Sequence, residues 1–571
     1  MLKLRICMKI LFNHIGYAPD DAKVLLIDAP EKTSWRELAL VSLPDGATVW
    51  RGAATFAGGV AGWSVGPWWR ADVSAVRAPG RYALRWATAD ATGQSEGFEI
   101  AESLFGQALV SDLLFYFKGQ RCAGIYDRAD RRAKRVGDGA VRDVRGGWFD
   151  ASGDTSKYLS HLSYANFMNP QQTPLVVWVL ARAWHLCRAA GAPPYFLERI
   201  QAEALHGADW LVRMQDPAGF WHVTVFDRWS KDPAARELCS YRTQKGDKYD
   251  DYQAGWRQGG GMAAAALALA STLGDGDEFR RADYFAAAQK GFAHLQQHGL
   301  GYLDDGQENI IDDTCALLAA VELQAVAPGA SVAAELEKRL ASLVARRRAT
   351  DGTVWLAADG AGERSWFHAS DAGLPLVALL RLADALPGHA QAGAARDVAK
   401  ELVCAQLALG QEYNNPFGYP PHWVKTAGVA GRVQWFYPHE NPSGYWWQGE
   451  NARLASLAAA AQALGAATRD PAPAAAARRW TDWVLGANPF DRCMLQGRGR
   501  NNPVYSPPYD NAPGGVCNGI TSGFTDERDI AFAPTPQATD PAQNWRWGEQ
   551  WLPHGAWLLY ALALRETGGR S

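Results

Sequence analysis

The spacing of apolar residues changes near residue 100, and this change constrains the fold more than any other feature. Up to that point short apolar runs are separated by Gly, Pro and Asp, and in the segment 81–86 large apolar side chains alternate with small or charged ones. This alternation is typical of a half-buried strand. Six or seven such strands within 100 residues predict an all-β sandwich of immunoglobulin type over residues 1–100.

Beyond residue 101 the apolar residues recur with the helical period of about 3.6. The pattern predicts a dozen helices, joined by loops rich in Gly, Pro and aromatic residues. Several segments, such as 262–271, are apolar nearly all round and are expected to be buried on two sides. We therefore expect two concentric rings of six helices, an all-α (α/α)6 barrel over residues 101–571, in a multidomain chain. The predicted helices are 103–116, 173–190, 195–214, 261–273, 279–298, 313–325, 332–347, 370–386, 394–409, 451–464, 474–485 and 551–565.

Composition limits the partners and the compartment. Lys and Arg total 57 against 60 Asp and Glu, so the net charge of −3 argues against a nucleic-acid partner. The sequence contains no run of 18 apolar residues, so it predicts no membrane span. The eight cysteines show neither disulfide nor metal-ligand spacing, and the N-terminus is a poor secretory signal. We expect a cytoplasmic monomer or homodimer with no metal and no cofactor.

The predicted loops combine aromatic rings with carboxylates. Trp occurs 25 times, and many of these residues lie in segments such as GGWFDASGD, WFYPHENPSGYWWQGEN and NWRWGEQWLPHG. Loops of a helical toroid gather at one end, and Trp faces there can stack on sugar rings. The pattern predicts an oligosaccharide-binding groove; the alternative is that the rings only fill the mouth of the barrel.

One carboxylate pair stands out. The segment GGWFDASGDTSKY places Asp150 and Asp154 in a turn with only small residues between them. Two carboxylates held close together raise one pKa, as a general base near neutral pH requires. The structural alternative is that Asp154 caps a helix.

Glycoside hydrolysis also needs a carboxylic acid that protonates the leaving oxygen. Glu450 in YWWQGENARL and Glu549 in NWRWGEQWLPHG both lie among Trp residues, which would raise their pKa values. These local surroundings do not show which of the two glutamates is the general acid.

The whole chain resembles glycoside hydrolase family 9, in which an immunoglobulin-like domain precedes an (α/α)6 barrel. The resemblance lies in FNHIGY at 12–17, GGWFDASGDTSKY at 146–158, AGWRQGGG at 254–261, NPFGYP at 415–420 and LGANPF at 485–490. It implies that Asp154 is the general base and that Asp150 helps to hold the water. It also implies that Glu549, fourteen residues before the final Ala of GEQWLPHGAWLLYALA, is the general acid. Glu450 would then be a groove residue that touches substrate.

The sequence departs from the family pattern at three places. The turn reads DASGD, one residue longer than the family's DAGD; Glu450 replaces a Ser; and the family's His-His-Arg segment is missing, with Arg498 and Arg500 as weak substitutes. The segments DASGDTSKYLSHLSYANFMNPQQ and YWWQGENARL resemble the branch that removes glucosamine from chitosan oligosaccharides more than they resemble the cellulases. Extra carboxylates at Asp150 and Glu450 would favour a protonated amino group.

The expected function is therefore an inverting β-1,4-glycoside hydrolase, an exo-β-D-glucosaminidase. The alternatives are an endoglucanase or cellodextrinase on β-1,4-glucan, a non-catalytic oligosaccharide-binding protein, and a polysaccharide lyase on the same toroid. Further candidate groove residues, each with packing as its alternative, are Trp148, Trp446, Trp447, Trp547, Asp251, Tyr252, His439 and His554.

Overall fold

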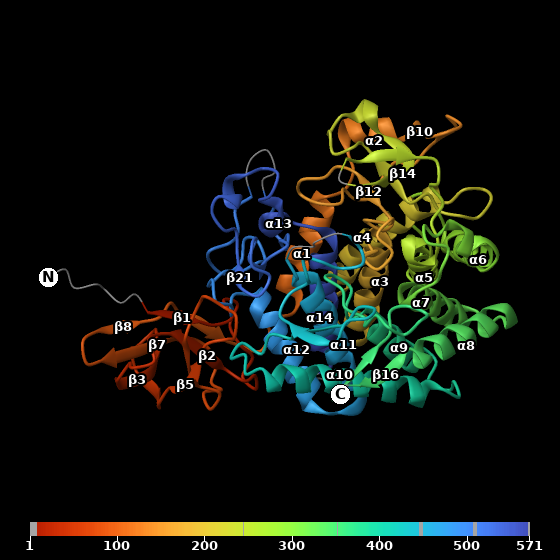
Figure 1. Ribbon diagram of the computed structural model, residues 1–571. Coiled ribbons are helices and arrows are strands. Elements are labelled where there is room, and N and C mark those ends of the chain that lie inside the picture. Colours follow the sequence, from red (N-terminus) through yellow and green to blue (C-terminus); the bar gives the residue numbers. More distant parts are fainter. Residues whose placement is uncertain (1–7, 244, 351, 445–448, 506–510, 569–571) are drawn as a thin grey trace.

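The N-terminal part of the chain is a sandwich of two antiparallel sheets (Figure 1). The computed structural model describes residues 8–243, 245–350, 352–444, 449–505 and 511–568. One sheet has the order β1-β2-β6-β5; in the other the order is β4-β3-β7-β8, with β9 also paired to β7. The strands are β1 Lys9–Leu11, β2 Val24–Asp28, β3 Trp35–Ser42, β4 Thr48–Arg51, β5 Thr55–Gly58, β6 Trp68–Asp72, β7 Gly80–Thr88, β8 Thr92–Gln94 and β9 Phe98–Ile100. Leu25, Ile27, Leu40 and Leu84 are among the buried side chains between the sheets.

Six helices form a closed inner ring in which each helix contacts the next, α3 to α5, α7, α9, α11, α14 and back to α3. These inner helices are α3 Thr173–Ala189, α5 Gly261–Ala270, α7 Ile310–Val326, α9 Leu374–Ala385, α11 Asn451–Thr468 and α14 Leu552–Gly568. Because each has neighbours on several sides, polar faces are scarce, and all residues of α5 are buried.

The outer ring consists of helices that each pack mainly on one inner helix. They are α1 Gln107–Gly119 on α14, α4 Pro194–Met214 on α3, α6 Arg281–His298 on α5, α8 Ala330–Ala345 on α7, α10 Ala392–Glu412 on α9 and α12 Pro471–Val484 on α11. The predicted architecture, a β-sandwich followed by an (α/α)6 barrel, is confirmed.

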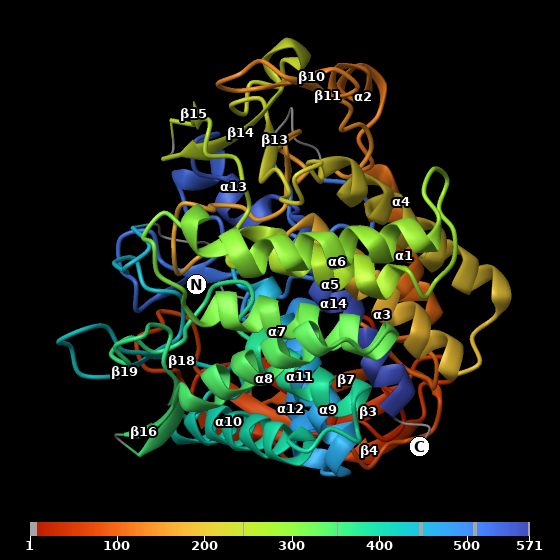
Figure 2. The same cartoon turned by 90° about the vertical axis from the view of Figure 1, so that its right-hand side faces the viewer.

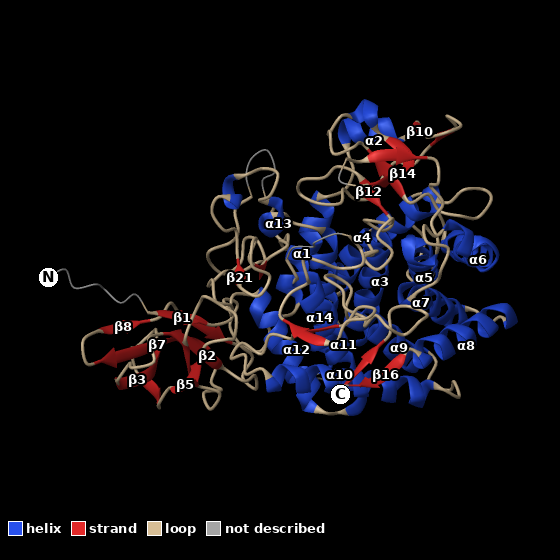
Figure 3. Cartoon of the chain, in the orientation of Figure 1, coloured by secondary structure: helices blue, strands red, loops and turns tan. Residues whose placement is uncertain are grey.

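One end of the barrel carries elements that the sequence pattern did not predict (Figures 2 and 3). A sheet of short strands has the order β11-β10-β14-β13-β12, with β15 paired to β14. Its strands are β10 Ala133–Arg135, β11 Val141–Arg142, β12 Lys157–Tyr158, β13 Thr224–Phe226, β14 Glu237–Arg242 and β15 Asp247–Tyr249. Two short helices, α2 Gly124–Asp130 and α13 Trp545–Gly548, were also missed. Elements of two to seven residues show too few repeats for a periodicity to emerge.

The remaining elements are short. Two-stranded sheets pair β16 Arg347–Thr350 with β17 Thr353–Leu356, β18 His422–Val424 with β19 Arg432–Gln434, and β20 Thr521–Ser522 with β21 Ile530–Ala531. Single helical turns occur at Pro233–Ala235, Trp256–Gly260, Gly299–Tyr302 and Gln537–Thr539. None of the described helices is long and apolar enough to cross a membrane.

The sandwich packs against the barrel through specific contacts. The Asn13 side chain donates a hydrogen bond to Asp482 on α12 at 2.6 Å, and Arg565 on α14 forms an ion pair with Asp21 at 2.5 Å. The ring of Trp63 stacks on Phe436, with 6.0 Å between centroids. The two domains therefore share a buried interface.

Candidate active site

The three predicted catalytic carboxylates line one pocket. Asp150, Asp154 and Glu549 surround a cavity of about 260 Å³ at the barrel end that carries the small sheet. Figures 1 and 2 show α13, which precedes Glu549, at the same end of the molecule as this sheet. The other lining residues are Ala151, Gly153, His161, Leu162, Trp229, Tyr505, Asn518, Pro541, Trp545 and Trp551.

Main-chain pairing brings these residues together from opposite ends of the barrel sequence. The amide of Ser152 donates to the carbonyl of Gln550 at 2.8 Å, and the amide of Gln550 donates back to the Ser152 hydroxyl at 3.0 Å. The amide of Leu552 donates to the carbonyl of Asp150 at 3.2 Å. Ser152 lies in the lengthened DASGD turn, so this turn is fastened directly to the segment that carries Glu549.

Asp154 is held by two donors immediately before and within β12. Its Oδ1 accepts the main-chain N–H of Ser156 at 2.8 Å, and its Oδ2 accepts the hydroxyl of Tyr158 at 2.7 Å. Burial, followed by repulsion from Asp227, raises the pKa of Asp154 to about 6, although both hydrogen bonds oppose the rise. At neutral pH the carboxylate is ionised and has the proton affinity that a general base needs.

Glu549 follows α13 and lies against the backbone of Gly153. A Cβ atom at Gly153 would collide with the Glu549 carboxylate, so any other residue there would displace that carboxylate. Burial and then repulsion from Asp154 raise the pKa of Glu549 to about 8, against the opposing effects of the Gly153 N–H and Lys231. Glu549 is therefore protonated at neutral pH and has a proton to give.

Asp150 lines the same pocket as these two groups. Its Oδ2 accepts the indole N–H of Trp551 at 3.0 Å, while its buried Oδ1 has no hydrogen-bond partner. Burial, with repulsion from Asp154 and Glu549, holds the pKa of Asp150 well above its usual range. The free Oδ1 can accept a hydrogen bond from a water or from a ligand.

The nearest histidine carries no charge that would offset these carboxylates. Nδ1 of His161 lies 3.9 Å from Oδ2 of Asp150, and burial lowers the pKa of His161 to about 3. The imidazole is neutral at physiological pH. The pocket thus contains an ionised carboxylate and a protonated carboxylic acid, the combination that general acid–base hydrolysis uses.

Asp227 controls the charge on Asp154 from outside the pocket. Its buried carboxylate accepts hydrogen bonds from Thr155 at 2.7 Å and from Ser156 at 3.0 Å. We expect Asp227→Asn to lower the pKa of Asp154, because the substitution removes a repelling charge. The acid limb of kcat/KM against pH should move to lower pH.

The control for this substitution is Asp397→Asn, which removes one charge from an exposed position of α10. Its pH profile should match that of the wild type. An acid limb that stays in place in Asp227→Asn, or moves to higher pH, would show that Asp227 does not tune the base.

Two of the predicted stacking residues are wrong. Trp148 and Trp547 are fully buried, and the indole N–H of Trp148 donates to Glu203 at 2.7 Å. Neither side chain has a face open to a ligand. Trp446 and Trp447 lie outside the described residues.

Glu450 is also not a groove residue in this structure. It is 1% exposed and does not line the pocket. Its carboxylate accepts hydrogen bonds from the Tyr419 hydroxyl at 2.6 Å and from the Tyr437 N–H at 2.5 Å, and it lies 3.0 Å from Arg453 and 3.1 Å from His422. Burial favours the neutral form, but His422 and Arg453 outweigh it and lower the pKa of Glu450. Glu450 is therefore a buried counter-ion of Arg453.

Two predicted polar groove residues follow β15 of the small sheet. Asp251 is exposed and forms an ion pair with Arg242. Tyr252 is half-buried, with the Arg135 guanidinium 5.0 Å from the centre of its ring. Neither residue lines the pocket that holds the carboxylates.

The two predicted histidines also lie outside the pocket lining. His439 pairs with the Ser522 hydroxyl at 3.0 Å. His554 is fully buried, and its Nε2 is 3.0 Å from Oδ1 of Asn518, which does line the pocket. The structure therefore places His554 behind Asn518, where it can position the Asn518 amide.

The basic residues considered as substitutes for the missing His-His-Arg segment pair elsewhere. Arg498 forms an ion pair with Asp112 at 2.6 Å, and Arg500 forms one with Asp491 at 2.6 Å. Neither of them lines the pocket.

The aromatic residues that do line the pocket were missed in the sequence. Trp229 and Trp545 are half-buried and part of the lining, whereas Trp547 points away. Residues two positions apart on a helical turn face different sides, so only one of the two Trp residues of α13 can reach the cavity. A helix assigned to residues 545–548 would have indicated that only one of these two Trp residues faces the pocket.

No group of three or more His, Cys, Asp or Glu within the described ranges could hold a metal ion.

The comparisons with known proteins agree with this architecture. The model described as Glycosyl hydrolase family 9 matches residues 105–507, and the one described as Cellulase N-terminal ig-like domain matches residues 7–91. Asp150 and Asp154 lie inside the first match, and Glu549 lies beyond it. A search of the curated proteins finds no match.

Solved structures share the fold at low sequence identity. A metagenome-derived glycoside hydrolase family 9 endoglucanase is 19% identical with a TM-score of 0.67, covering 98% of this chain and 99% of that one. A Bacteroides ovatus GH9 protein is 17% identical with a TM-score of 0.64, covering 98% of both chains. AaCel9A in complex with cellobiose-like isofagomine is 20% identical with a TM-score of 0.65, covering 97% of this chain and 99% of that one. From its matched catalytic and N-terminal regions, the chain belongs to glycosyl hydrolase family 9 and is a glycoside hydrolase.

Proposed function

We propose that this enzyme hydrolyses β-1,4-linked oligosaccharides with inversion of the anomeric carbon. Asp154 takes a proton from a water that Asp150 also holds, and the water oxygen forms the new bond to C1. The bond from C1 to the glycosidic oxygen breaks, and Glu549 gives its proton to that oxygen. The observation that carries the proposal is the shared pocket in which Asp154 is ionised and Glu549 is protonated at neutral pH.

The first candidate substrate is a β-1,4-glucan oligosaccharide. One solved structure with the same fold is named an endoglucanase, and another, AaCel9A, is in complex with cellobiose-like isofagomine. The sequence argument for glucosamine relied in part on Glu450, which is sealed inside the barrel and already paired with Arg453. Because Glu450 does not lie in the groove, it cannot bind a protonated amino group there, and a neutral sugar is favoured.

The second candidate is a chitosan oligosaccharide, with the chain acting as an exo-β-D-glucosaminidase. Oδ1 of Asp150 is buried without a partner, and Asp154 and Asp227 add negative charge nearby. A protonated amino group would satisfy Oδ1 and would favour ionisation of Asp150.

A side-by-side assay distinguishes the candidates. Cello-oligosaccharides and chitosan oligosaccharides of equal length are incubated with the enzyme, and new reducing ends and product lengths are followed over time. Faster release from the cello-oligosaccharides supports the first candidate; release of single glucosamine units supports the second. Binding without new reducing ends, or formation of unsaturated sugars, would contradict hydrolysis.

The pKa values predict a bell-shaped pH profile for kcat/KM. Activity should fall as pH drops through about 6, where Asp154 becomes protonated, and as pH rises through about 8, where Glu549 loses its proton. Initial rates across this range test the prediction. Activity that keeps rising above both values would show that no protonated acid is needed.

A cytoplasmic location remains part of the proposal. The free thiols of Cys122, Cys187, Cys239, Cys315, Cys404, Cys493 and Cys517 support it, because disulfides are rare in reducing compartments. Fractionation of the producing cells, followed by immunoblotting, tests the location. Recovery outside the cytoplasmic fraction would contradict it.

A further inference from the structure

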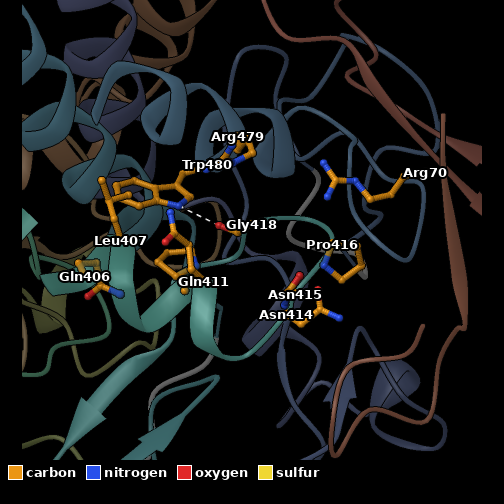
Figure 4. A pocket seen from close by; sticks show the side chains of 12 residues that line it. Arg70, Gln406, Leu407, Gln411, Asn414, Asn415, Pro416, Gly418, Arg479 and Trp480 are labelled. Carbon is orange, nitrogen blue, oxygen red and sulfur yellow. Dashed lines mark hydrogen bonds between the residues drawn. The ribbon is translucent and has the colours of Figure 1, made fainter. Parts of the chain in front are cut away.

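A second pocket lies where the sandwich meets the barrel, remote from the catalytic carboxylates. It has a volume of about 290 Å³ and is lined by residues from β6, α10, α12 and the loop after α10 (Figure 4). Arg70 reaches toward it from β6 of the sandwich, and Arg479 belongs to α12 of the barrel. No Asp or Glu is among the described residues that line it.

Asp482 lies near both arginines but forms no ion pair with either of them. Within the described part of the chain neither Arg70 nor Arg479 has a carboxylate in ion-pair distance or a hydrogen-bond acceptor, although both side chains are exposed. Partial burial and then repulsion from Arg70 lower the pKa of Arg479, while attraction to Asp482 opposes this decrease. The nearby carboxylate of Asp482 lies outside this pocket and accepts a hydrogen bond from Asn13. Two guanidinium groups close together without an acceptor attract an anion.

A buried amide gives a second, independent indication of a ligand. Asn415 lines the pocket and is 7% exposed, and its Nδ2 has no hydrogen-bond partner. Leaving a buried donor unpaired costs free energy, which a ligand acceptor would recover. Gln406, Gln411 and Asn414 also line the pocket and offer amide groups.

We propose that this pocket binds a small hydroxylated anion, a sugar phosphate or a sugar acid. Arg70 and Arg479 take the anionic group between them, as the planar guanidinium favours phosphate and carboxylate oxygens. Asn415 and the neighbouring amides bind the hydroxyl groups. The cavity has the size of a small-ligand site. Since one arginine comes from each domain, the ligand links the sandwich to the barrel.

Calorimetric titration of the full-length protein tests this proposal. The probes are glucose 6-phosphate and glucuronate, with inorganic phosphate as an anion without a sugar and glucose as a neutral sugar. We expect one molecule of at least one sugar anion per chain, weaker binding at higher salt, and no binding of glucose. The bound ligand should also raise Tm, because it binds only the folded protein.

Variants locate the site. Arg70→Gln and Arg479→Gln should each weaken binding about tenfold or more. The matched control is Arg36→Gln, which removes the same charge from an exposed position of β3 in the same sandwich. It should bind like the wild type, and so should Asp154→Asn, because the catalytic pocket is a different one. Should Arg479→Gln fail to fold, the exposed Arg70 decides alone.

Several outcomes would overturn the proposal. These are no binding of either sugar anion, binding of inorganic phosphate alone, and binding that Arg70→Gln leaves unchanged. Loss of binding in Asp154→Asn would place the ligand in the catalytic pocket and would overturn it as well.

Discussion

Replacing Asp154 by asparagine is expected to lower kcat by about a hundredfold to ten-thousandfold, the range that general base catalysis contributes. Asparagine keeps the size of the side chain but cannot take a proton from the attacking water. The loss should be equal for oligosaccharides and for aryl glycosides with good leaving groups, since every substrate needs the same attack. Steady-state rates on both substrate types measure it.

The control for Asp154→Asn is Asp397→Asn on the exposed surface of α10, which should keep wild-type activity. Circular dichroism and Tm should show that Asp154→Asn is folded, and calorimetry should show that it still binds oligosaccharide. A folded Asp154→Asn variant with near-normal turnover would exclude Asp154 as the base.

Glu549→Gln is expected to show a loss that depends on the leaving group. For oligosaccharides, whose leaving oxygen needs a proton, kcat should fall by about a hundredfold to ten-thousandfold. For a 2,4-dinitrophenyl glycoside, whose leaving group departs as an anion, most of the activity should remain. The alkaline limb of the pH profile, assigned to the raised pKa of Glu549, should disappear.

Glu198→Gln on the exposed face of α4 removes the same kind of group and should behave like the wild type. An equal loss on both substrate types in Glu549→Gln would show a role other than proton donation. Undiminished activity on oligosaccharides would reassign the acid. Glu450 would be a poor replacement, because it is buried and its neighbours His422 and Arg453 lower its pKa.

Periodicity was sufficient to predict the two domains and the helical rings. Long helices such as α4 and α10 repeat their apolar pattern over several turns, and the inner helices are recognisable because α5 is apolar all round. The small sheet around β14 was missed, because its strands are short and their pairing depends on distant partners.

Of the residues that form the candidate site, the sequence predicted only the three carboxylates. Asp150 and Asp154 share one turn, so their proximity follows from local sequence, while the approach of Glu549 depends on main-chain pairing between Ser152 and Gln550. The choice between Trp545 and Trp547 required the orientation of α13, which composition does not encode.

Glu450 shows the same limit for charged residues. Its partners Tyr419, His422 and Arg453 come from separate segments, and only the folded barrel reveals that its charge is already neutralised. A carboxylate among Trp residues in a sequence is therefore equally compatible with a substrate contact and with an internal ion pair.

The most direct test of the central claim, that Asp154 and Glu549 act as base and acid in a single displacement, is the anomeric form of the first product. Proton NMR spectra recorded during the first minutes of hydrolysis of a β-linked oligosaccharide resolve the two anomers before they equilibrate. The mechanism predicts that the α-anomer of the new reducing end appears first. Initial formation of the β-anomer would contradict it, because retention requires a covalent intermediate rather than direct attack by water.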